Sequence, residues 1–583
     1  MKLKSILLGA SALIALPVLA LAGEVSFSEV PFAADDAAKR QVLAADKIVI
    51  DGTEYAIGYN VLARTGDKLG EGVFGALVDQ DGKIVTNEDG SENLSTDADF
   101  TSLLPVGDKL FSVTHFESRP GAMYVSELTQ DADGKLTVVS TKPVEFKDLG
   151  GVWVPCAGSV TPWGTHLGSE EYPPNAESIE KAATLADIDD YYFPMVQFFG
   201  VDPAKMDLET FRTTFNPYAY GYPVEVVVAA DGSAKASKHY AMGRVAIELA
   251  YVMPDQKTAY ISDDGTNVGL YKFVADTAGD LTAGTLYAAK WVQTSAENGG
   301  AANLEWVDLG HATDAELAAV IAAKPKFSDI FEAADLGEGG TCGEGFAPSN
   351  AEGVMQCLKV KPGMEVAASR LETRRTASML GATTEFRKME GITFNPEKGV
   401  MYLAMSEVAK AMTAGDKKDL PGRDAIQLEK NGCGTVYELA LDANYSATSM
   451  TALISGKPTE YAADAPEAGN TCAINGISNP DNITYLTGYN TLIIGEDTGE
   501  GHQNDAIWSM NLADGKLTRI FSTPYGSETT SPYFYPNLNG HAYLMAVVQH
   551  PFGESDEDKM ADAADARAYV GYIGPMPAMG AAK

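Results

Sequence analysis

Positive charge is scarce in this sequence of 583 residues. It has 43 Lys and Arg against 80 Asp and Glu, which gives a formal charge of -37. A field of this sign repels nucleic-acid backbones and anionic lipid. We therefore expect no nucleic-acid partner and no polybasic membrane anchor, whereas a dense acidic surface can bind hard cations.

Long apolar runs are also missing. No run beyond the start of the chain reaches the roughly 18 apolar residues of a transmembrane helix, so no membrane span is expected. Residues 1–22 have the pattern of a Sec-type signal peptide, with Lys2 and Lys4 before a short apolar stretch and a small-x-small cleavage site ending at Ala22. The prediction is a periplasmic or extracellular protein whose residues 23–583 form one catalytic domain.

Cysteine is rare, with five residues in all. In an oxidising compartment four can pair and one is left over. Proximity favours Cys342 with Cys357 and Cys433 with Cys472, although spacing alone does not prove connectivity. For the odd residue, Cys156, a buried free thiol is the simpler interpretation and a thiolate metal ligand is the alternative.

The familiar catalytic motifs are absent. The sequence has no GxSxG elbow, no Walker loop, no HExxH and no paired CxxC, and its seven histidines are scattered. Its 57 glycines and 28 prolines disfavour long helical bundles, while a hydrophobic content of 45% is too high for a disordered chain.

What the sequence does have is a repeated unit. Each copy starts with a polar or acidic residue, continues through an apolar strand, a turn and a second apolar strand, and ends on an acid or, in one weaker copy, on a histidine. The turns PDQK, NPEK and TGYN carry the Pro, Asn, Asp or Gly that hairpins need. The clear copies span 248–264, 390–407 and 481–497, and weaker ones span 99–117, 156–171 and 528–550.

A hairpin returns its two ends to the same side, so the opening and closing acids of each unit share one face. Six such units arranged radially predict an all-β fold, a β-propeller of about six blades whose inner strands line a central channel. Extra length near 172–235 and 292–370 predicts inserted helical or loop segments. There Thr313 to Glu316 has the pattern of a capping box that opens a short helix.

Acids gathered at one end of a channel repel one another unless cations lie among them. Any one of these acids is more simply a solvated loop residue, but the repeated spacing of the set favours a metal centre. Oxygen ligands suit calcium or magnesium and a thiolate suits iron, so the site could be mixed. The candidate metal ligands are Glu117, Cys156, Glu170, Glu171, Glu248, Asp263, Asp264, Glu390, Asp481, Glu496 and Asp497.

Four basic residues stand just before Glu390. Cations there could contact a phosphate oxygen, and a solvated basic stretch or carboxylate partners are equally open. These residues are Arg374, Arg375, Arg387 and Lys388.

With these residues in view, the sequence resembles the PhoX-type alkaline phosphatases. The Cys156 segment and the QHP string are its more specific motifs. The resembling segments are CAGSVTPWGTHLGSEE from Cys156, GRVAIELAYVMPDQKTAYISDDGTNVGLYKF from Gly243, GDLTAGTLYAAKW from Gly279, TRRTASMLGATTEFRKMEGITF from Thr373, NPDNITYLTGYNTLIIGEDTG from Asn479, PYGSETTSP from Pro524 and VVQHPFGE from Val547.

The resemblance implies a β-propeller enzyme that hydrolyses phosphate monoesters outside the cytoplasm and holds a cluster of iron and calcium. It implies that Cys156 is an iron ligand and adds Glu528 to the candidate metal ligands. Two departures stand out. The arginine that the family usually has two residues before its matching glutamate is Lys388 here, and the export signal looks Sec-type where the family usually uses the twin-arginine route.

The leading hypothesis is a metal-dependent phosphatase acting on small phosphorylated substrates, in which metals neutralise the phosphoryl oxygens and present an oxygen nucleophile. Lys388, Arg387 and Glu390 are its candidate catalytic residues. Two alternatives stay open: a non-catalytic calcium-binding propeller that serves structure or a partner, and a phosphodiesterase or phosphotriesterase on the same scaffold.

Overall fold

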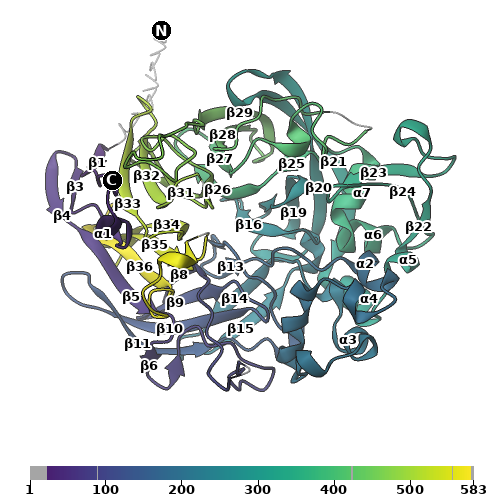
Figure 1. Ribbon diagram of the computed structural model, residues 1–583, viewed down its shortest axis with the longest axis horizontal. Helices are drawn as coiled ribbons and strands as arrows, with labels where there is room; N and C mark the ends of the chain where they lie inside the picture. The colour runs from purple at the N-terminus through teal and green to yellow at the C-terminus, as the bar shows by residue number, and fades with distance from the viewer. Residues whose placement is uncertain (1–22, 88, 422–424, 500, 555, 580–583) are drawn as a thin grey trace, which may run out of the picture.

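The structure is a computed structural model that describes residues 23–87, 89–421, 425–499, 501–554 and 556–579. Within these ranges, six four-stranded antiparallel units surround one axis (Figure 1). An extra strand joins two of them into a nine-stranded sheet, and another adds a fifth strand to a third unit. The predicted signal peptide, residues 1–22, lies outside the described residues.

Each four-stranded unit is one blade of the ring, and its strands follow one another from the axis outward. Blades one to three are β8 (Ala98–Val106), β9 (Lys109–Phe116), β10 (Ala122–Gln130) and β11 (Leu136–Pro143); β12 (Ser159–Val160), β13 (His166–Gly168), β14 (Val224–Val228) and β15 (Ala234–Lys238); and β16 (Ile247–Val252), β17 (Thr258–Asp263), β19 (Tyr271–Thr277) and β20 (Asp280–Ser295). Blades four to six are β26 (Met389–Asn395), β27 (Val400–Met405), β28 (Thr435–Leu441) and β29 (Ala447–Ser455); β30 (Pro480–Leu486), β31 (Thr491–Glu496), β32 (Ala506–Asn511) and β33 (Leu517–Ser522); and β34 (Glu528–Leu538), β35 (His541–Gln549), β36 (Tyr569–Pro577) and β5 (Gly58–Arg64).

The innermost strands close a ring. Neighbouring blades touch through β8, β12, β16, β26, β30 and β34, and β34 touches β8 again. Blade six takes its outer strand, β5, from the other end of the chain, where Asn60 pairs with Tyr572. The predicted all-β propeller of about six blades is therefore confirmed.

Apolar clusters lie between adjacent blades. Tyr124 of blade one packs with Tyr543 and Tyr572 of blade six in one such cluster, and all three rings are buried. Since burial of a large side chain stabilises a fold by roughly 1.5–3 kcal/mol, these inter-blade layers hold the ring closed.

Helices α2 to α7 lie outside the ring and gather on one side of it, whereas α1 lies on the opposite side (Figure 1). Between β13 and β14 come α2 (Ala176–Lys181) and α3 (Leu208–Thr214); between β20 and β26 come α4 (Asp314–Ala322), α5 (Phe327–Ile330), α6 (Glu365–Leu371) and α7 (Thr373–Leu380). The predicted capping box is confirmed, because the Thr313 hydroxyl accepts a 3.2 Å bond from the Glu316 amide at the start of α4. Among the described residues, no helix combines the length and apolar composition that a membrane crossing requires.

Smaller elements complete the chain. They are α1 (Asp36–Lys39); the sheet of β1 (Val25–Phe27), β3 (Lys47–Ile50) and β4 (Thr53–Ala56); β2 (Leu43–Ala44), which extends blade five; β6 (Lys68–Leu69) with β7 (Gly72–Val73); β18 (Thr266–Val268) with β25 (Phe386–Arg387); the sheet of β22 (Phe331–Ala334), β24 (Val354–Val360) and β23 (Ala347–Ala351); and β21 (Ala301–Thr313), which joins β20 to β29.

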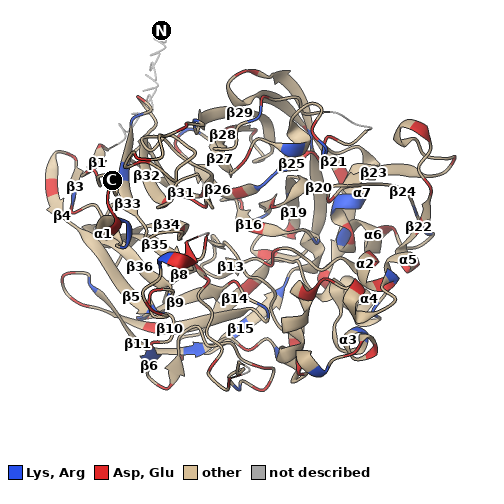
Figure 2. Cartoon of the chain, in the orientation of Figure 1, with Lys and Arg blue, Asp and Glu red and all other residues tan. Residues whose placement is uncertain are grey.

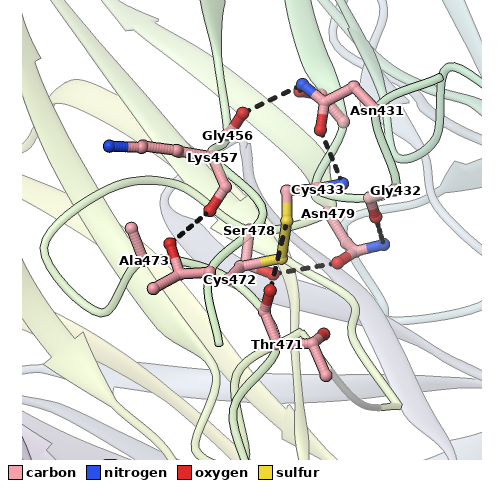
Figure 3. Close-up of a disulfide and its surroundings, with 12 residues drawn as sticks. Asn431, Gly432, Cys433, Gly456, Lys457, Thr471, Cys472, Ala473, Ser478 and Asn479 are labelled. Carbon is pink, nitrogen blue, oxygen red and sulfur yellow. Dashed lines mark hydrogen bonds between the residues drawn. A yellow bond between two sulfur atoms is a disulfide. The ribbon is translucent and has the colours of Figure 1, made fainter. Parts of the chain in front are cut away.

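The two sequence-favoured disulfides are present, and Cys156 is a buried free thiol. The Cys433–Cys472 bond braces the loop before β30 (Figure 3). Beside it, the Asn479 amide nitrogen Nδ2 donates to the carbonyl of Gly432 at 3.1 Å, and the backbone amide of Asn479 donates to the carbonyl of Cys433 at 3.0 Å. The disulfide therefore anchors the backbone two residues before Asp481.

Candidate metal centre

Five of the six innermost strands, all except β12, deliver a side chain to the axis through a β-bulge. The ladder register slips between Ala98 and Thr101 in β8, and it slips at the matching place in β16, β26, β30 and β34. A bulge locally re-aims side chains, and this one lies at the same depth in each of these strands. The first residues inside the five slips are Asp99, Glu248, Glu390, Asp481 and Ser531.

The backbone before several of these positions is strained. Lys388, Asn479 and Val154 have positive φ angles of 43°, 40° and 39°. Each stands two residues before a candidate ligand, and the last is β-branched, a residue type that rarely adopts this region. At Gly391 the two neighbouring blades approach so closely that only glycine fits, because a Cβ there would lie 2.7 Å from the Asn482 backbone of the next blade.

Four of these bulge residues, Asp99, Glu248, Glu390 and Asp481, converge with Glu117, Cys156 and Glu171. Cys156 Sγ lies 3.0 Å from Glu248 Oε2 and 3.3 Å from Asp99 Oδ2. The potential ligand atoms fall into three overlapping groups, each within 4.8 Å: Asp99, Glu117 and Cys156; Cys156, Glu171 and Glu248; and Glu248, Glu390 and Asp481.

The electrostatics of this axial cluster require positive charge. Burial raises the pKa of Asp99 to about 6, and burial together with Glu390 and Asp99 raises the pKa of Glu248. Burial and the neighbouring Glu248 and Asp99 also raise the pKa of the Cys156 thiol. Buried anions that repel one another destabilise the fold unless cations lie among them.

The donor set fits metal ions. Carboxylate oxygens suit hard cations, and one thiol adds a soft ligand. Two buried carboxylate oxygens, Asp481 Oδ2 and Asp264 Oδ1, accept no hydrogen bond within the described part of the chain. Each is an acceptor available to a cation.

A cavity of about 460 Å³ opens above the cluster. Its wall includes Glu117, Asp497 and Glu528 and two of the predicted cations. Lys388 Nζ lies 3.2 Å from Asp497 Oδ2 and 3.8 Å from Glu390 Oε1. On the same wall, Arg387 Nε donates to Glu407 Oε2 at 2.9 Å.

Asp264 joins the axial cluster to this wall. Burial alone would raise its pKa, but Lys388, a hydrogen bond from the Tyr172 hydroxyl and Arg387 lower the pKa below its usual value. Asp264 is thus held as an anion beside Glu171 and Glu390, whose pKa values it helps to raise.

Three predicted ligands face away from the axis, so the structure does not support them in that role. Glu170 Oε1 pairs with Lys238 Nζ at 2.8 Å, and both side chains are fully buried. Asp263 accepts from Arg374 Nε at 2.9 Å, and Glu496 accepts from Trp508 Nε1 at 2.6 Å and lies 2.9 Å from His502 Nδ1. Their oxygens are already satisfied.

The same contacts place the other two predicted cations. Arg374 is committed to Asp263, and Arg375 pairs with Glu372 at 2.6 Å in α7. Both arginines support the inserted segment, so the carboxylate-partner interpretation holds for them.

Sequence reasoning missed Asp99 as a site residue. It opens the copy that spans 99–117, in the place that Glu248 and Glu390 occupy in theirs, so the repeat contained the signal. Arg119 and Tyr172, which line the cavity, had no such signal.

A buried chain of hydrogen bonds supports the Cys156 segment from behind. His115 Nδ1 lies 2.5 Å from the Cys156 carbonyl, the two Nε2 atoms of His115 and His166 are 2.6 Å apart, and His166 Nδ1 is 2.9 Å from the Ser102 hydroxyl. Burial lowers the pKa of His115 to about 4 and also lowers that of His166. With both rings neutral, one proton arrangement satisfies every bond: Ser102 donates to His166, His166 to His115, and His115 to Cys156.

Fold and site together define a six-bladed β-propeller with an axial, thiol-containing acidic cluster. The chain belongs to the alkaline phosphatase PhoX family, whose profile matches residues 115–552. It is therefore a metal-dependent phosphatase. No curated protein sequence matches it.

Two solved structures are among those similar to this chain. Pseudomonas fluorescens PhoX in complex with vanadate, a transition state analogue, has 18% identity and a TM-score of 0.60, covering 94% of this chain and 98% of its own. A putative 6-phosphogluconolactonase from Bacteroides uniformis has 10% identity and a TM-score of 0.31, covering 96% and 98%. The first of these shows that the whole propeller is shared.

Proposed function

We propose that this chain hydrolyses small phosphate monoesters at the axial cluster, with iron held through Cys156 and calcium held by the surrounding carboxylates. The observation that carries the proposal is the convergence of Cys156 with acids from blades one, three, four and five. We propose as ligands Asp99, Glu117, Cys156, Glu171, Glu248, Asp264, Glu390, Asp481, Asp497 and Glu528.

When bound, such metal ions neutralise phosphoryl charge and lower the pKa of water at the site. The chain's own residues bind and orient the substrate. Lys388 presents an ammonium group to the cavity, and Asp497 and Glu390 hold it there. Because the chain carries a charge of -37, this local cation also offsets the repulsion that an anionic substrate meets.

We further propose that the protein works outside the cytoplasm. Two disulfides support this, because such bonds persist in oxidising compartments. The pattern of residues 1–22 supports it as well.

The test combines metal analysis with turnover. Protein purified from the exporting cell should contain both iron and calcium and should hydrolyse p-nitrophenyl phosphate, more slowly after calcium removal. Cys156→Ser should lose iron and turnover together. Ser126→Ala, at a buried small residue of β10 away from the cluster, is the matched control and should keep both.

Two results would redirect the proposal. Calcium without iron, and no turnover, would identify a structural calcium-binding propeller. Cleavage confined to phosphodiesters or phosphotriesters would keep the metal centre and change the substrate class.

A further inference from the structure

Arg119 is a third cation on the cavity wall. It follows β9 in blade one, and its guanidinium carbon lies 3.6 Å from the centre of the Tyr191 ring. Tyr191 belongs to the 3-10 segment Asp190–Phe199 of the insertion between β13 and β14. Stacking on this ring fixes the guanidinium plane at the edge of the cavity.

The positive charge of Arg119 acts on Asp97, which lines the same cavity, without forming a direct ion pair with it. Its Nε is buried without a hydrogen-bond partner, and no ion pair within the described ranges includes it. Lys388 and Arg387, on the same wall, each have a carboxylate partner within 3.2 Å. An arginine that borders an acidic cavity and forms no direct ion pair with any carboxylate of the described residues can bind an anion from solution.

We propose that Arg119 binds a phosphate oxygen of the substrate, from blade one, while Lys388 contacts the same phosphate from blade four. This inference rests on the proposed function and adds a specificity-determining residue to it. A guanidinium matches a phosphate through two parallel N–H donors, a contact that the single ammonium group of a lysine cannot make.

The experiment compares Arg119→Gln with a matched control. Arg64→Gln is the control, because Arg64 also stacks on a tyrosine, at 3.9 Å from Tyr569, and also has a buried, unpartnered Nε, but it lies on β5 away from the cavity. For holoprotein, we expect Arg119→Gln to raise KM for p-nitrophenyl phosphate and the inhibition constant of inorganic phosphate together, by about 10-fold or more. Arg119→Lys should restore part of this loss, and Arg64→Gln should change neither constant by more than about twofold.

A measurement on the unmodified chain covers the case in which Arg119→Gln does not fold. Inorganic phosphate should slow the reaction of Arg119 with phenylglyoxal, followed by mass spectrometry. The reference is Arg40, which pairs with Asp36 of α1 and does not line the cavity, and its reaction rate should not change. Lack of protection would overturn the inference. So would a folded Arg119→Gln protein that loses only thermal stability and keeps both constants within about twofold.

The two proposals fail separately. Wild-type holoprotein that turns over no monoester contradicts the proposed function, and calorimetric titration with inorganic phosphate still decides whether Arg119 binds the anion. Normal turnover with unchanged constants in Arg119→Gln contradicts the Arg119 inference alone.

Discussion

Adjacent acidic residues have opposite roles in this molecule. Glu170 is paired with Lys238 behind the blades, whereas Glu171 lies in the axial cluster with Cys156 and Glu248. Two other adjacent pairs divide in the same way, Asp263 from Asp264 and Glu496 from Asp497, with the first member satisfied by protein donors and the second facing the cluster or its cavity.

Geometry explains the division. Neighbouring residues of an extended chain point to opposite sides, so when one carboxylate faces the axis the other faces the protein interior. The interior one requires a fixed partner, and the axial one is left for an ion. The same residue type therefore stabilises the fold in one position and repels its neighbours in the next.

The most direct test of this division between partnered and axial acids replaces each glutamate of one pair by glutamine. Glu170→Gln leaves the Lys238 charge buried and alone, which should lower the free energy of unfolding by about 3–5 kcal/mol. Glu171→Gln removes repulsion with Asp264 and Glu248, so chelator-treated protein should be as stable as wild type or more so. Urea unfolding of both variants without metal measures the difference.

Metal content supplies the second half of that comparison. Glu171→Gln should lose bound metal, whereas folded Glu170→Gln should keep it. A loss of stability in both variants, of similar size, would show that the distinction between axial and partnered acids is false.

A smaller effect concerns a partnered histidine. His239 Nε2 lies 3.0 Å from Glu225 Oε2 and its Nδ1 lies 3.2 Å from Asp314 Oδ2. Burial alone would lower its pKa, but these two acids raise it to about 9. Because the pKa is higher in the folded state than the ordinary value of about 6.5, the stabilisation is complete below pH ~6.5 and is lost as pH rises through ~9.

Over that window, the unfolding free energy of wild type should fall by about 3 kcal/mol relative to His239→Gln. Denaturation profiles of both proteins from pH 6 to 10 measure it. Parallel profiles would show that His239 is not charged in the folded protein.

The smallest expected effect is at Lys388. Lys388→Arg keeps the charge and adds a planar fork, so KM for p-nitrophenyl phosphate should fall by about threefold, with little change in melting temperature. Steady-state kinetics on holoprotein tests this. A rise in KM would indicate that the point charge, and not bidentate contact, suits this wall of the cavity.

The repeat made much of the site predictable. Glu248, Glu390 and Asp481 open matching hairpins, and a hairpin delivers its ends to one face whatever the fold around it. The sequence did not separate Glu170 from Glu171, because their orientation depends on a tertiary contact: the Glu171 amide donates to the carbonyl of Val154, the strained residue two places before Cys156, at 2.9 Å. Arg119 could not be predicted from the sequence for another reason. Its proposed role depends on its place at the cavity wall and on the lack of an ion pair with any described carboxylate, and both are visible only in the folded structure.

The outer strand of blade six has a consequence for assembly order. Since β5 begins at Gly58 and its partner β36 ends at Pro577, the circle of blades is joined only after the residues from 58 to 577 have been made. A nascent fragment lacks the finished pocket, however many of the acids it already contains. A site that combines acids from blade one with Glu528 of blade six therefore exists only after the last blade has packed against the first.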